Sequence, residues 1–113
     1  MEEIAVRAET QEAERDVIVV VTLEGRSWLM NVRATPAEWQ RLSEVPAADW
    51  RRRRAVRLGT VAGVDVWWHV SDDTLYMTLG EDGPESADVG LVLPVGVLRR
   101  ILDEVAAARD ESP

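Results

Sequence analysis

The sequence contains no cysteine, no lysine and no phenylalanine, and it has a single histidine. Without cysteine the chain can form neither disulfides nor thiolate metal sites, and it can hold no cysteine nucleophile. No apolar run approaches the roughly 18 residues that a membrane span requires. The beginning of the chain is acidic and lacks the apolar core of a secretion signal. We therefore expect a protein without a membrane segment, located in the cytoplasm.

What the sequence has in excess is acid. The 21 aspartate and glutamate residues, against 13 arginines, give the 113-residue chain a formal net charge of -8. A chain of this length forms one domain, and 46% hydrophobic residues are enough for one ordinary core. We predict a partly ordered acidic segment at 1–16, a single globular domain at 17–109 and a frayed tail at 110–113.

Apolar, β-branched runs separated by turn residues predict strands along most of the chain. These runs lie at 17–23, 27–33, 55–61, 64–70, 74–79 and 89–93. Ile4, Val6 and Ala8 also alternate as in a short strand, within the segment expected to be partly ordered. Because the connections are short, consecutive strands should be antiparallel neighbours.

Two segments carry helix signals. The first helix is predicted at 36–45, where Thr35 can cap it, Pro36 occupies its first position and Glu38 completes a capping box. The second is predicted at 94–108 from an apolar stripe at helical spacing. The fold class that follows is α+β: a twisted, mostly antiparallel sheet of five or six strands, with the two helices packed on one face.

No pattern typical of a catalytic site is present. No serine stands in a Gly-x-Ser-x-Gly context, and no glycine-rich phosphate loop occurs. His69 could share a metal ion with Asp65, but four residues along a strand separate the two by about 13 Å. An enzyme would have to work through carboxylates and His69. We therefore predict that the protein is not an enzyme and has no catalytic residues, no cofactor and no metal site.

The segment from Asp72 to Asp88 carries only negative charges. Such a surface keeps a protein soluble, and it can also attract a basic partner quickly. Trp67 and Trp68 are adjacent on a predicted strand and must face opposite sides, so one of them can anchor a partner unless a second element covers it. The predicted partner-binding residues are Trp67, Trp68, Asp72, Asp73, Glu81, Asp82 and Glu85.

These features favour a non-catalytic, acidic protein-binding module. Its most concrete form is an immunity or inhibitor protein that neutralises a basic partner, because such proteins are often small, acidic and free of catalytic groups. An outward tryptophan together with a strand edge would also suit a homodimer.

A run of arginines contrasts with the acidic sequence around it. Five positive charges fall within seven residues, at Arg51, Arg52, Arg53, Arg54 and Arg57. Guanidinium groups bind phosphate and carboxylate well, so these residues form an alternative, nucleic-acid-binding site. A second interpretation makes them counter-charges to acids of the same chain, such as Glu24 or Asp65.

The strands that end in a helix at Pro94, with an Arg-rich strand and tryptophans, resemble the PC4-like and whirly coactivator architecture. The resemblance covers only this ending and the general topology, and no diagnostic run of residues matches. It implies a protein that binds single-stranded nucleic acid. The net charge of -8 favours a protein partner instead, because phosphate binding needs a positive local field.

Overall fold

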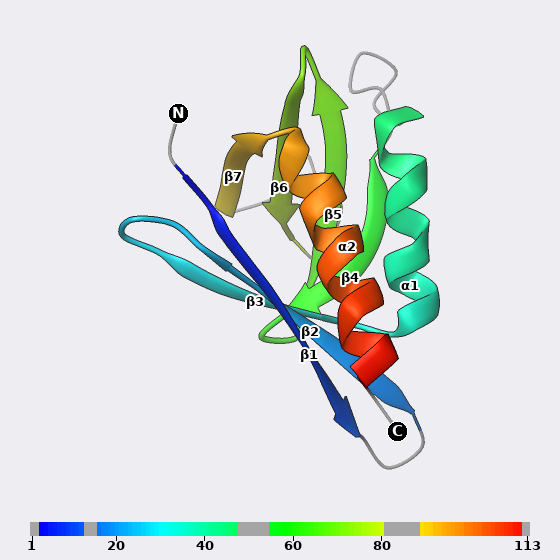
Figure 1. The fold of residues 1–113 in the computed structure, drawn as a ribbon. Helices are drawn as coiled ribbons and strands as arrows, with labels where there is room; N and C mark the ends of the chain where they lie inside the picture. The colour runs from blue at the N-terminus through cyan, green and yellow to red at the C-terminus, as the bar shows by residue number, and fades with distance from the viewer. Residues whose placement is uncertain (1–2, 13–15, 48–54, 81–88, 112–113) are drawn as a thin grey trace.

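A single antiparallel sheet and two helices make up the computed structural model, which describes residues 3–12, 16–47, 55–80 and 89–111 (Figure 1). The order of the strands in the sheet is their order in the sequence. The seven strands are β1 (Ala5–Glu12), β2 (Val17–Glu24), β3 (Leu29–Ala34), β4 (Val56–Val61), β5 (Val64–Ser71), β6 (Thr74–Leu79) and β7 (Val89–Pro94). The helices are α1 (Pro36–Gln40), which continues as the 3-10 helix η1 (Arg41–Ala47), and α2 (Gly96–Glu111). The predicted α+β class with an antiparallel sheet is confirmed.

The sheet has seven strands, which exceeds the five or six that the sequence predicts, and the strand outside the predicted runs is β1. It lies in the segment expected to be partly ordered, and it pairs with β2 over its whole length. The alternation of its side chains explains the pairing, since Ile4 and Val6 are buried in the core while Glu9 is exposed. The hydroxyl of Thr10 also donates a hydrogen bond to the carbonyl of Ala108 in α2 (3.3 Å). The helix therefore helps to hold β1 on the sheet.

α1 is shorter than the helix predicted at 36–45. The capping box is present: the N–H of Glu38 donates to Oγ1 of Thr35 (3.2 Å), and the N–H of Thr35 donates to Oε1 of Glu38 (3.2 Å). The α-helical geometry nevertheless ends after 5 residues, and η1 continues the chain with Pro46 inside it. Proline lacks an N–H and crowds the carbonyl four residues before it, which prevents an α-helix from running through this position.

α2 begins later than the sequence predicts. The expected range was 94–108, whereas Pro94 is the last residue of β7 and forms the final pair of the sheet with Thr74. An edge strand accepts proline where the missing N–H would face away from the sheet. The helix therefore starts only at Gly96, and it runs on to Glu111.

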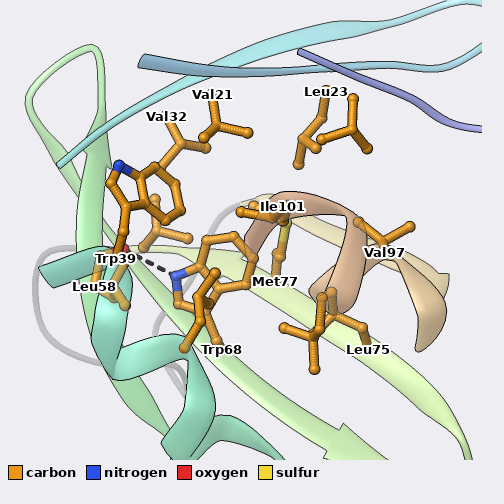
Figure 2. Packing of buried hydrophobic residues seen from close by; sticks show 14 of the residues in the cluster. Val21, Leu23, Val32, Trp39, Leu58, Trp68, Leu75, Met77, Val97 and Ile101 are labelled. Carbon is orange, nitrogen blue, oxygen red and sulfur yellow. Dashed lines mark hydrogen bonds between the residues drawn. The ribbon is translucent and has the colours of Figure 1, made fainter. Parts of the chain in front are cut away.

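Alternation along the strands gives the sheet two faces, and both helices lie on the same one (Figure 1). We call it the inner face, and the opposite face the outer face. The core lies between the inner face and the helices, and it includes Val21, Leu23, Val32, Trp39, Leu58, Trp68, Leu75, Met77, Val97 and Ile101 (Figure 2). Within it Trp39 and Trp68 meet edge to face, with ring centroids 6.3 Å apart and planes at 76°. Neither of the two described helices covers the outer face.

A bulge in β4 depends on Gly59. The register between β4 and β5 shifts between Arg57 and Thr60, and Gly59 lies within the shift with a φ of 76°. A Cβ at this position would lie 2.9 Å from Cγ1 of Val32 and 3.0 Å from the carbonyl oxygen of Arg33. The position therefore requires both a left-handed backbone and the absence of a side chain, and glycine alone provides both.

Alanine substitutions at Gly59 and Gly63 distinguish the cost of the left-handed backbone from the cost of the steric clash. Gly63, in the turn between β4 and β5, has a φ of 84° and no atom within 4 Å of an added Cβ. We expect Gly63→Ala to lower the unfolding free energy by about 1 kcal/mol, the cost of the backbone conformation alone. Gly59→Ala should lower it by about 3 kcal/mol, because overpacking adds to that cost. Urea unfolding followed by circular dichroism measures both losses, and equal losses would contradict the close approach of β3.

Candidate protein-binding face of the sheet

Two rows of side chains cross the outer face from β4 to β7. Each row is a set of cross-strand partners: Arg57, Trp67, Thr78 and Gly90 in the first, and His69, Tyr76 and Val92 in the second. Partners on neighbouring strands have Cβ atoms about 5 Å apart, so the side chains of a row lie side by side, while Gly90 contributes only its backbone. We call the residues of both rows the outer patch.

The adjacent tryptophans are divided between the two faces, as neighbouring positions on a strand require. Trp68 is fully buried in the core, where its indole N–H donates to the carbonyl of Leu58 (2.9 Å; Figure 2). Trp67 is half-buried in the outer patch, and its indole N–H donates to the carbonyl of Gly80 (2.9 Å). Of the two predicted anchors, Trp67 is therefore the one that a partner can reach.

Conservative replacement of each tryptophan distinguishes the two environments. We expect Trp68→Phe to lower the unfolding free energy by about 3 kcal/mol, because it leaves a cavity and a buried carbonyl without its donor. Trp67→Phe should cost about 1 kcal/mol, since water can reach the half-buried site and replace the lost hydrogen bond. Guanidinium unfolding of both variants measures these losses. A larger loss for Trp67→Phe would contradict its place on the outer face.

His69 and Tyr76 form a stacked pair at the centre of the second row. Their ring centroids are 4.8 Å apart and their planes differ by 5°. His69 is only 6% exposed, and this burial lowers the pKa of its imidazole by disfavouring the charged form. Val92, the third member of the row, is 63% exposed on the edge strand β7. The row therefore runs from a buried ring to an accessible aliphatic side chain.

The lowered pKa of His69 predicts that stability depends on pH. Well above the usual histidine pKa of 6.5, the imidazole is neutral in both the folded and the unfolded chain. As the pH falls through this value, the unfolded chain takes up the proton more readily than the folded one, so stability decreases. We expect the wild type to lose more stability than His69→Gln between about pH 7.5 and pH 5.5, in urea titrations at each pH. Identical pH slopes for the two proteins would exclude this role of His69.

Arg57 is the one member of the predicted arginine site among the described residues. Outside them lie Arg51, Arg52, Arg53 and Arg54. The guanidinium of Arg57 forms an ion pair with the carboxylate of Asp65 on the next strand (3.6 Å). Arg57 therefore acts as a counter-charge to an acid of the same chain, which was the second interpretation of the arginine run. An exposed pair of this kind contributes at most about 1 kcal/mol, so it leaves the guanidinium available to another ligand.

Of the predicted acidic binding residues, the described part of the chain includes only Asp72 and Asp73. Asp72 and Asp73 form the exposed two-residue turn between β5 and β6, with φ values of 49° and 61°. Outside the described residues lie Glu81, Asp82 and Glu85. Gly80, which precedes them, donates its N–H to the carbonyl of Asp65 at the opposite end of the β5–β6 hairpin (3.1 Å). The acidic turn therefore lies at the end of the hairpin that is farther from Trp67.

Sequence reasoning did not select Tyr76 and Val92 as binding residues. The alternation of β6 does place Tyr76 on one face with Thr74 and Thr78. The sequence does not show the order of the strands, which is also needed to find the site. Only the register of β6 with β7 brings Val92 opposite Tyr76, and only the position of β7 at the edge leaves it exposed.

The rest of the described chain offers no competing site. No group of three or more histidine, aspartate or glutamate side chains is placed there to hold a metal ion. None of the helices in that part is long and apolar enough to cross a membrane. An open hollow of about 1020 Å³ lies between the start of β1, the β2–β3 turn and Arg100 of α2. Its lining mixes carboxylates with guanidinium groups, which favours no single class of ligand.

Comparisons of the chain with known protein families, with curated proteins and with solved structures find no match. The function must therefore be inferred from the geometry and the charge of the chain itself.

Proposed function

We propose that the chain is a non-catalytic protein-binding module of the cytoplasm, which contacts a basic partner protein through the outer patch. In its most concrete form it is an immunity or inhibitor protein that neutralises this partner. The observation that carries the proposal is that neither helix of the described residues covers the outer face, on which Trp67, Tyr76 and Val92 occupy neighbouring strands. Binding hot spots are enriched in tryptophan and tyrosine set among other contacts that exclude water.

The exposure of Val92 supports this assignment because of its neighbours. Single exposed aliphatic side chains are common on soluble proteins and need no explanation. Val92, however, lies directly opposite Tyr76, which is itself stacked on His69. An exposed apolar side chain that continues an aromatic row is a better mark of an interaction site than an isolated one.

The charge of the chain supports a basic partner. The net charge is -8, and the exposed turn of Asp72 and Asp73 adds a local negative end to the β5–β6 hairpin. Such charges accelerate the encounter with a positively charged protein and weaken with salt. The apolar patch would then supply the contacts that persist in the complex.

Binding of single-stranded nucleic acid is a second candidate because Arg57 is the direct cross-strand partner of Trp67. A guanidinium beside an indole ring is suited to a phosphate and a stacked base. The ion pair of Arg57 with Asp65 and the overall negative charge reduce the positive field that such binding needs.

A charge placed in the outer patch tests the proposal. Val92→Glu puts a carboxylate next to Tyr76, whereas Leu29→Glu puts the same charge on the outer face of β3, at a residue that is also exposed (53%). Proteins captured from an extract of the producing cells would be compared between the wild type and both variants, and the dissociation constant of each candidate measured by calorimetry. We expect Val92→Glu to weaken the specific partner at least about tenfold and Leu29→Glu less than about threefold.

The same proteins would be titrated with single-stranded DNA and RNA, with Arg57→Gln as an additional variant. Equal weakening by Val92→Glu and Leu29→Glu would show that the outer patch is not the contact surface. Saturable oligonucleotide binding that Arg57→Gln weakens would replace the protein partner by the second candidate. Asp72→Asn with Asp73→Asn, which keeps the left-handed turn, should slow association with a basic protein without changing the fold.

A further inference from the structure

The two edges of the sheet are protected to different degrees. The edge strand β1 carries Arg7, Glu9 and Glu12, and α2 contacts it through the bond between Thr10 and Ala108. The edge strand β7, with the sequence Val-Gly-Leu-Val-Leu-Pro, carries no charge at all, and no described strand pairs with its free side. Natural sheets usually protect an edge with charged residues, a bulge or a covering element. β7 has only its terminal proline, so it is the edge that a further strand can join.

The register shows which backbone groups face this free edge. In an antiparallel sheet the N–H and C=O groups of successive residues point alternately to the two neighbouring strands. Gly80 donates its N–H to the carbonyl of Asp65 in β5. The backbone N–H and C=O groups of the even-numbered residues of β6 therefore point toward β5, and those of its odd-numbered residues point toward β7. The β7 partners of those odd-numbered residues are Leu93, Leu91 and Val89. The N–H and C=O groups of Gly90 and Val92 therefore point away from the sheet.

We propose that the free edge of β7 binds an extended, basic segment of the partner protein as an additional strand. This inference rests on the proposed function and specifies how the partner is held. The edge supplies backbone donors and acceptors at Gly90 and Val92, and main-chain pairing of this kind gives affinity while alternate side chains give specificity. The side chain of Val92 would contact apolar residues of the added strand on the outer face.

Charge selects a basic segment over a second copy of the chain. The acidic turn of Asp72 and Asp73 directly precedes Thr74, which pairs with Pro94 at the end of β7. An added strand with arginine or lysine beside this end meets opposite charge. A second copy of the chain would instead bring a further net charge of -8, and like charge opposes such a dimer.

The direct test uses a capped peptide of six alternating arginine and valine residues, as long as β7, added to the isotope-labelled full chain. In the free protein the amide hydrogens of Gly90 and Val92 should exchange with solvent at least about tenfold faster than those of Leu91 and Leu93. The peptide should shift the resonances of Gly90 and Val92 and slow their exchange at least about tenfold. A matched peptide with glutamate in place of arginine should bind at least about tenfold more weakly.

Two variants of one residue separate the backbone from the side chain. Val92→Pro removes an N–H that no strand of the sheet uses, so the fold should survive, as thermal melting would verify. Val92→Thr keeps this N–H and the β-branched shape. We expect Val92→Pro to weaken peptide binding at least about tenfold and Val92→Thr less than about threefold.

Several results would overturn the proposal. Equal peptide binding by the proline and threonine variants would show that the edge backbone is not used. Peptide-induced shifts confined to Trp67 and Tyr76 would show the same, and they would leave the outer patch as the binding surface. Slow exchange of Gly90 and Val92 without peptide, together with a dimer in sedimentation, would assign the edge to a second copy. A basic strand would also be excluded if both peptides bind with equal affinity, or if neither binds at millimolar concentration. The comparison of partner capture by Val92→Glu and Leu29→Glu tests the outer patch separately from the edge.

Discussion

Two buried indole rings join the layers of this fold. Trp39 on α1 donates its N–H to the carbonyl of Val19 in β2, and Trp68 on β5 donates to the carbonyl of Leu58 in β4, both at 2.9 Å. The rings meet edge to face between these bonds. One contact thus connects the helix to three strands and satisfies two polar groups that would otherwise be costly to bury. Because side chains alternate along a strand, the burial of Trp68 also forces Trp67 outward, and the composition of the outer patch follows from that choice.

Much of the fold follows from local patterns in the sequence. The continuous apolar run of β2, the capping box of Thr35 and Glu38 and the stripe of α2 each depend on nearby residues, and all three were predictable. The extent of α1 was not, because Pro46 allows a tight 3-10 continuation where an α-helix was expected. The order of β1 was also underestimated, because its many acidic residues are typical of a solvated segment. Its buried residues alternate with exposed ones, and contacts with β2 and α2 hold it on the sheet.

The candidate site was less predictable because it, too, depends on contacts between segments distant in the sequence. The sequence shows that Trp67 and Trp68 face opposite sides, but it contains no sign of which one the helix covers. It also treats the acids from Asp72 onward as one surface, whereas β6 places Asp72 and Gly80 at opposite ends of a hairpin. Properties that depend on strand order and register therefore required the structure, while those that depend on composition did not.

The molecule combines an apolar patch on the outer face with an acidic chain. The two described helices cover the inner face, and the outer patch places Trp67, Tyr76 and Val92 beside an edge strand without charge. In the proposed function, long-range attraction would come from the acids and short-range contact from the outer patch and the edge of β7. Electrostatic steering and apolar anchoring act at different distances, so a small domain can use both without a catalytic group.

The proposed function requires that the exposed end of the outer patch, at Val92, is open to solvent in the isolated protein. Relaxation of methyl groups by a neutral, soluble paramagnetic agent measures this access directly. We expect the methyl groups of Val92 to relax as strongly as those of exposed Leu29, and those of Val21 and Leu75 on the inner face to be shielded. Shielding of Val92 to the level of Leu75 would contradict the proposed function, because this end of the outer patch would then already be covered.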